Sequence, residues 1–179
     1  MLGLATSVQN NKGYATGEKN RERFNLPINN TAGAYHATGN PVGFNGSNYI
    51  GGFDNALEYA NFTDVNATKS NPLVSGHASN VLRVTAGATN GNTSVYIKTV
   101  PNVAYTLSID VVAVEAGSAC VIMVGTGASD TTYYSSGNVT GAATKKTTFT
   151  PAEISVCLTI LSKTNTKYVD VDNISFKRA

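Results

Sequence analysis

The sequence KYVDVDNISFK at residues 167–177 carries the clearest β-strand pattern in the chain. Its large residues are strand formers, and apolar residues alternate with polar ones, as a strand with one buried face requires. The two valines are nevertheless out of phase by one residue with the isoleucine and phenylalanine that follow them. Because a one-residue slip turns every later side chain to the other face, we expect a β-bulge at Asp172-Asn173. The stretch therefore predicts a long final strand that closes a sheet.

The composition of the 179-residue chain favours an all-β protein. Charged residues make up only 13%, tryptophan is absent, and long stretches rich in Glu, Lys, Leu and Ala are missing. This profile is typical of proteins with many short strands and turns. A membrane-spanning helix would need a run of about 18 apolar residues, and the sequence has none, so we expect no membrane partner.

The net charge of +2 is confined to residues 1–47, because the rest of the chain has equal numbers of basic and acidic side chains. A folded part without a basic surplus lacks the electrostatic footprint of a nucleic-acid-binding protein. The start, MLGLA, has no basic segment of the kind that precedes a secretory signal, which indicates synthesis in the cytosol. We therefore expect Cys120 and Cys157 to be buried free thiols.

Residues 1–47 form a segment unlike the rest, with few large apolar residues and no persistent period. Alone, such a segment buries too little surface to offset its ordering entropy. One interpretation is a disordered tail, and the other is an arm that becomes ordered on a neighbouring subunit or partner. Spaced apolar residues that suit the anchors of an extended strand favour the arm. The residues expected to bind the partner are Phe24, Leu26, Ile28, Arg21 and Arg23.

From residue 48 onwards, strand-like runs follow one another with turn signals between them. Asn90-Gly91, Pro101-Asn102 and Gly117-Ser118 are such turns, whereas residues 55–79 read as an irregular excursion. No helical pattern interrupts the strands. We expect an all-β, antiparallel jelly-roll β-sandwich of about eight strands over residues 48–179, preceded by an extended N-terminal arm over residues 1–47.

Five short motifs in this region carry a family resemblance. They are GGFD at 51–54, SNVLRVT at 79–85, VPNVAYTLSIDV at 100–111, TTFT at 147–150 and VDNISF at 171–176. In this order they resemble the jelly-rolls of carbohydrate-binding modules, in which an NGGFE/D opening, an SLKVT strand, a YTLS strand and a DNVSV close recur. The resemblance covers about residues 48–177. The glycine usual before YTLS is replaced by Asn102-Val103-Ala104.

The resemblance implies a calcium site. The family often holds a structural Ca²⁺ between the opening acidic residue and that of the terminal strand, and the matching positions are Asp54 and Asp172. Calcium takes six to eight oxygen ligands, some of which a bulge beside an aspartate can supply as free carbonyls. The alternative is that Asp172 accepts hydrogen bonds from backbone amides at the bulge. We expect no cofactor other than this calcium ion.

Sugar binding calls for an exposed aromatic ring, and tyrosines are the candidates in the absence of tryptophan. Tyr133 and Tyr134 are adjacent, so only one of them can face outward from a strand; either is a candidate glycan contact. Tyr96 and Tyr105 also lie in strand-like runs, and Tyr105 is expected in the core. The alternative for these rings is a contact with the core or with another subunit.

Catalytic motifs are missing from the sequence. His36 and His77 lie in different irregular segments, and neither accompanies a serine or cysteine in a pattern that builds a nucleophilic triad. Asp170 and Asp172 share one strand face, but an acid/base pair is the weaker interpretation of that spacing. We therefore expect no catalytic residues and no enzyme activity.

A second resemblance concerns the layout of the chain. A short start, a Gly/Asn-rich basic arm and a small β-sandwich are similar to virion proteins of tailed phages. This implies a capsid decoration or cement protein, made in the host cytoplasm and placed in the virion. Its arm would anchor it to the major capsid protein or another virion protein, and we expect a homo-oligomer, specifically a trimer. The alternative is a glycan-binding or adhesion module on a virion or a secreted protein, with a surface glycan as partner.

Overall fold

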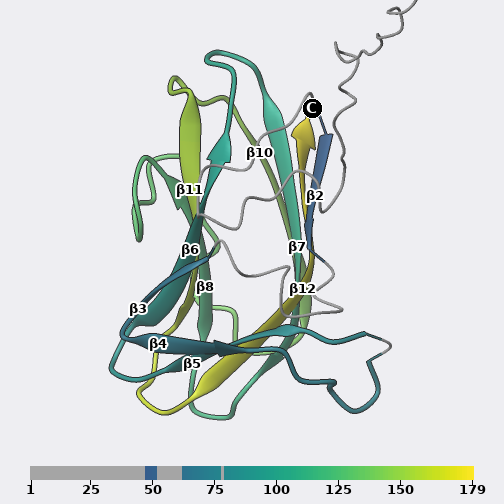
Figure 1. Cartoon of the computed structure of the whole chain (residues 1–179), viewed down its shortest axis with the longest axis vertical. Coiled ribbons are helices and arrows are strands. Elements are labelled where there is room, and N and C mark those ends of the chain that lie inside the picture. Colours follow the sequence, from purple (N-terminus) through teal and green to yellow (C-terminus); the bar gives the residue numbers. More distant parts are fainter. Residues whose placement is uncertain (1–46, 52–61, 78) are drawn as a thin grey trace, which may run out of the picture.

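The computed structural model describes residues 47–51, 62–77 and 79–179, which form two antiparallel β-sheets packed face to face (Figure 1). The strands are β2 (Ser47–Gly51), β3 (Thr63–Val65), β4 (Ala67–Ser70), β5 (Leu82–Ala86), β6 (Gly91–Lys98), β7 (Tyr105–Val114), β8 (Cys120–Gly125), β9 (Tyr134–Ser135), β10 (Ala143–Phe149), β11 (Ser155–Ser162) and β12 (Tyr168–Arg178). This confirms the all-β sandwich. The short strands β3 and β4 lie in the segment expected to be irregular. In the described part of the chain, no helix has the length and apolar character needed to cross a membrane.

Strand β12 is central to the six-stranded sheet, whose order is β10-β7-β12-β5-β4 with β2 also paired to β12. On one side β12 pairs with β7 along most of its length. On the other side its first half pairs with β5 and its second half with β2, which lies beside the C-terminal end of β12 in Figure 1. The change of partner falls at Asp172 and Asn173.

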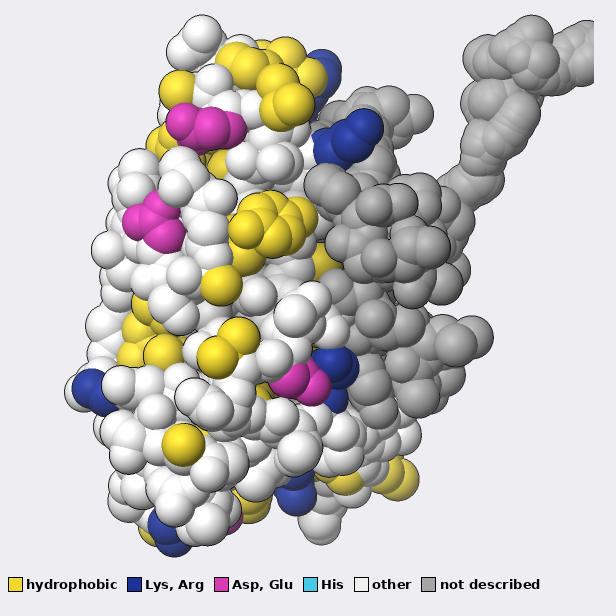
Figure 2. Space-filling model, turned by 60° about the vertical axis from the view of Figure 1, so that its left-hand side comes forward, with side chains coloured by type: hydrophobic (Ala, Val, Ile, Leu, Met, Phe, Trp, Pro, Cys, Tyr) yellow, Lys and Arg dark blue, Asp and Glu magenta, His cyan; other side chains and the backbone are white. Residues whose placement is uncertain are grey.

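The five-stranded sheet has the order β3-β6-β11-β8-β9, with β11 at its centre. Its inner face contributes Val156, Leu158 and Ile160, all fully buried, to the space between the sheets. Figure 2 shows the molecule turned so that this layer comes forward, with a group of hydrophobic side chains at its upper end, others scattered among polar ones, and few charges. Such scattered exposure is normal for a protein surface.

The core lies between the sheets and follows from strict alternation in β7. Tyr105, Leu107, Ile109 and Val111 are buried, while the residues between them face outward. The ring of Tyr105 stacks on that of Phe176 with centroids 5.1 Å apart. Its hydroxyl oxygen accepts a hydrogen bond of 2.9 Å from the amide of Val100, so the buried ring keeps its polar group paired.

The predicted bulge in β12 is confirmed. Asp172 pairs with Asp110 and Ser175 pairs with Ser108, so β12 has one residue more than β7 in this interval. Asn173 is exposed and takes a φ of 50°, a left-handed conformation that asparagine tolerates better than most residues. The valines before the bulge and the isoleucine and phenylalanine after it are all fully buried.

Both cysteines are buried and free, as the sequence predicts. Burial raises the pKa of the Cys120 thiol to about 12, so this group stays protonated at neutral pH. Burial also raises the pKa of Cys157. Each behaves as a small apolar residue of the sandwich.

Candidate functional site

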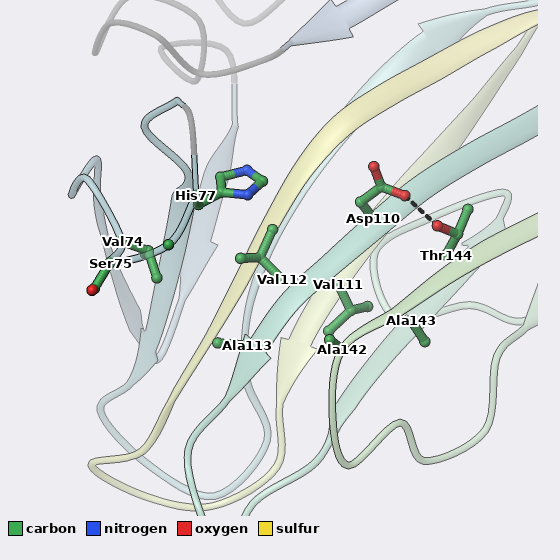
Figure 3. Close-up of a pocket in the computed structure, with 11 residues that line it drawn as sticks. Val74, Ser75, His77, Asp110, Val111, Val112, Ala113, Ala142, Ala143 and Thr144 are labelled. Atoms are coloured by element: carbon green, nitrogen blue, oxygen red, sulfur yellow. Dashed lines mark hydrogen bonds between the residues drawn. The ribbon is translucent and has the colours of Figure 1, made fainter.

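A pocket of about 630 Å³ lies on the outer face of the six-stranded sheet (Figure 3). Three segments line it: residues 74–77 of the β4–β5 loop, residues 110–113 of β7, and residues 142–144 at the start of β10. We call it the outer pocket. It joins parts of the chain that are far apart in sequence.

The floor of the outer pocket comes from an irregularity in β7. Ala113 pairs with Asp170 and Val111 pairs with Val171, so Val112 is an extra residue without a partner on β12. Val112 and Ala113 are both half-buried. This second bulge leaves two small aliphatic side chains in succession, and both line the pocket.

Two carboxylates lie side by side next to this floor. Asp110 of β7 and Asp172 of β12 are directly opposite partners, so both point to the outer face. Asp110 accepts hydrogen bonds from Thr144 Oγ1 at 2.6 Å, drawn in Figure 3, and from Asn173 Nδ2 at 3.0 Å. These neutral donors fix the carboxylate without cancelling its charge.

Asp172 is fully buried and is surrounded by donors. Its Oδ1 accepts the backbone N–H of Asn173 at 2.8 Å. Its Oδ2 accepts the hydroxyl of Ser79 at 2.8 Å and lies 2.7 Å from His77 Nε2. The carboxylate therefore ties the β4–β5 loop to the sheet at the point where β12 changes partner.

The β4–β5 loop holds its shape through its own hydrogen bonds. The amide of His77 donates to the carbonyl of Val74 at 3.0 Å, and Gly76 between them takes a φ of 83° that suits glycine. Leu73 and Asn80 form an isolated β-bridge. The loop thus places His77 in the wall of the pocket.

Two residues before Asp172 on β12, Asp170 is fully buried and forms a bidentate ion pair with Arg83. Both N–H···O distances are 2.7 Å. The hydrogen bonds with Asp170 raise the pKa of Arg83. The guanidinium also stacks over the ring of Tyr168, 3.7 Å from its centroid. Here, unlike at Asp110, the buried charge is matched by an opposite one.

The predicted calcium site is only half visible, because Asp54 lies outside the described residues. Asp172 accepts the backbone amide of Asn173, as the alternative interpretation expects. No group of three His, Cys, Asp or Glu side chains comes together for a metal in the described ranges. The calcium site at Asp54 and Asp172 stays a prediction.

The tyrosines proposed as glycan contacts lie at β9, away from the outer pocket. Tyr133 stacks on Phe149, its hydroxyl hydrogen-bonds to Glu153, and its oxygen accepts the amide of Ala152 at 3.0 Å. Tyr134 is half-buried against the core. Their contacts are intramolecular, and a glycan contact by either stays a prediction. Tyr96, on the outer face of β6, is 40% exposed.

Sequence reasoning singled out Asp172 but missed its partners. His77 and Ser79 read as parts of an irregular segment, and only the fold brings them to β12. Both bind the same oxygen of Asp172, so the imidazole does not stand between the carboxylate and the hydroxyl as a nucleophilic triad requires. The predicted partner-binding residues Phe24, Leu26, Ile28, Arg21 and Arg23 lie outside the described residues.

Known structures share this fold. The chain is similar to the CBM22-1 xylan-binding domain of Xyn10C from Paenibacillus barcinonensis, with a TM-score of 0.54 and 11% identity over 74% of this chain and 92% of that one. It is similar to the C-terminal family 22 carbohydrate-binding module of Xyn10B from Clostridium thermocellum, with a TM-score of 0.55 and 13% identity over 73% and 93%.

A family 16 carbohydrate-binding module is also similar, with a TM-score of 0.50 and 18% identity over 66% of this chain and 91% of that one. No family model matches the sequence, and no curated protein sequence matches it significantly. The structural likeness confirms that the β-sandwich has the jelly-roll fold of carbohydrate-binding modules; it shows the fold alone.

Proposed function

We propose that this chain is a glycan-binding module and that its ligand lies in the outer pocket. The observation that carries the proposal is the pocket itself: fixed polar side chains beside an aliphatic floor on one sheet face. Its volume lies within the range of about 300–1,000 Å³ that small-ligand sites occupy. The similar solved structures, one of them a xylan-binding domain, support the same class of ligand.

The chemistry of the lining suits a sugar. The carboxylate of Asp110 can accept hydrogen bonds from hydroxyl groups, while Thr144 and His77 offer further polar atoms. Val112 and Ala113 give the C–H face of a pyranose an apolar surface. Since Thr144 and Asn173 already hold Asp110 in place, binding costs little additional side-chain entropy.

A pair of matched substitutions tests the proposal. Ala142 is exposed and lies at the pocket, whereas Ala128 is exposed in the loop after β8 and does not line it. We expect Ala142→Leu to fill part of the pocket and reduce retention on xylan or another polysaccharide by about tenfold or more, a loss of about 1.4 kcal/mol. Ala128→Leu should leave retention unchanged. Affinity electrophoresis of the full chain against a panel of soluble polysaccharides measures both.

Equal binding by both variants would place the glycan elsewhere, and the tyrosines at β9 would then be the next candidates. Retention of no polysaccharide by the wild-type chain would contradict the proposal as a whole. Circular dichroism spectra that match the wild type are the control for folding.

The capsid-decoration hypothesis stays a prediction with less support. Its arm lies outside the described residues, and the similar structures are carbohydrate-binding modules. A homo-oligomer and a virion location are likewise predictions. The similar modules agree with a chain that binds a ligand without converting it, as expected from the absence of catalytic motifs in the sequence.

A further inference from the structure

We propose that Asp110 makes the outer pocket selective by charge, so that glycans bearing protonated amines bind best and acidic glycans bind worst. This rests on the proposed function, since it names the class of glycan for the same pocket. The argument concerns one carboxylate, its partners and the side chains around it.

Among the described residues, no Lys, Arg or His side chain forms an ion pair with Asp110. Its two oxygens are bonded to the neutral groups of Thr144 and Asn173. In the part of the chain that the structure describes, the ion pairs of Lys69, Arg83 and Lys167 go to other acidic residues. Lys146 shares the outer face of β10, where it pairs with Ser108, but it forms no ion pair with Asp110.

A second carboxylate adds to the negative electrostatic potential around Asp110. Asp172 lies directly opposite on β12, and like charges at such positions destabilise a sheet. Neither lysine nor arginine occurs among the residues that line the pocket, whose only cationic candidate is His77, bonded to Asp172. A cation in the pocket would offset the repulsion, whereas an anion would add to it.

The geometry leaves room for an ammonium group. An ionised carboxylate offers about four lone-pair positions, of which Thr144 and Asn173 take one each. A protonated amine on a sugar ring supplies three donors and one positive charge. Its acetylated counterpart keeps the ring and its hydroxyls but loses the charge and gains an acetyl group, so the salt dependence and the Asp110→Asn variant are needed to isolate the electrostatic contribution.

Isothermal titration calorimetry on the full chain tests the inference with three probes: a glucosamine oligosaccharide, its N-acetylated form and a polygalacturonate oligosaccharide. At a pH where the amine is protonated, we expect the amine form to bind about tenfold more tightly than the acetylated form. This ratio should fall as the salt concentration rises. The acidic probe should bind most weakly.

Asp110→Asn should weaken the binding of the amine form more than that of the acetylated form, so that the preference for the amine form is lost. Asp64→Asn, which removes the same charge on β3, should keep the preference. Equal binding of the amine and acetylated forms by the wild type, or a preference that survives in Asp110→Asn, overturns the inference and leaves the proposed function standing. If xylan and all three probes fail to bind the wild type, the proposed function fails and the inference fails with it. The salt dependence of the wild type decides the matter even if Asp110→Asn folds poorly.

Discussion

At the scale of single residues, three aspartates on one sheet face are satisfied in three different ways. Asp170 is neutralised by a bidentate Arg83, Asp172 is surrounded by His77, Ser79 and a backbone amide, and Asp110 has only neutral donors. Burying a charge without a partner is costly, which explains the ion pair at fully buried Asp170. Asp110 is only half-buried and borders the pocket.

The carboxylate of Asp130, in the loop between β8 and β9 of the other sheet, is likewise bound by neutral hydrogen-bond donors. Its carboxylate accepts the amide and hydroxyl of Thr126 at 2.7 and 2.8 Å and those of Thr132 at 3.0 and 2.8 Å. These bonds, those from Thr126 first, lower the pKa of Asp130 well below its usual range. Gly125 permits the approach, since a Cβ there would lie 2.4 Å from Asp130 Cγ.

The lowered pKa of Asp130 predicts a pH-dependent contribution to stability. Because the folded pKa lies below the unfolded one, the contribution is complete above about pH 4 and is lost as the pH falls through the folded pKa. Asp130→Asn should therefore be less stable than the wild type at pH 7, and the difference should narrow below pH 4. Urea unfolding at several pH values measures this, and a difference that stays constant down to pH 2 would contradict it.

At the scale of elements, β12 depends on its bulge. The extra residue at Asn173 keeps both halves of the strand facing the core and also places an amide beside Asp110. A left-handed backbone costs an ordinary residue about 1–2 kcal/mol, whereas glycine adopts it freely.

The left-handed backbone predicts that two substitutions of Asn173 rank in stability opposite to their usual order in a strand. Asn173→Gly and Asn173→Ala both lose the hydrogen bond to Asp110, so they differ mainly in backbone strain at a φ of 50°. We expect the alanine variant to be about 1 kcal/mol less stable than the glycine variant, although glycine is ordinarily the poorer residue in a strand. Chemical denaturation compares them. A more stable alanine variant would mean that the strand does not need the left-handed residue.

The sequence predicts these elements to different degrees. Alternation finds β7 and β12, and the phase slip finds the bulge, because both are local signals. The sequence pattern does not reveal strands β3 and β4, because these short polar runs bury little surface. They are defined by their pairing with β6 and β5. The sequence pattern does not reveal the outer pocket either, because its side chains come from distant parts of the chain. His77 and Asp172, for example, are 95 residues apart in the sequence. No local pattern marks such a meeting.

At the scale of the whole molecule, the inner and outer faces of the six-stranded sheet have different roles. The face between the sheets supplies the core, and the outer face of the six-stranded sheet carries the pocket. The resemblance read from short motifs is borne out as a fold, because the order of strands is what those motifs record. Ligand identity does not follow from the fold, which hosts many functions, so the glycan must be argued from the pocket.

The measurement that tests the central claim most directly is NMR mapping of glycan binding on the full chain labelled with ¹⁵N. Titration with a xylo- or glucosamine oligosaccharide should shift the backbone amides of Val112, Ala113 and Thr144, which line the outer pocket. Amides near Tyr133 and Tyr134 should stay in place. Shifts confined to β9 and its neighbours, or no shift with any glycan, would contradict the account.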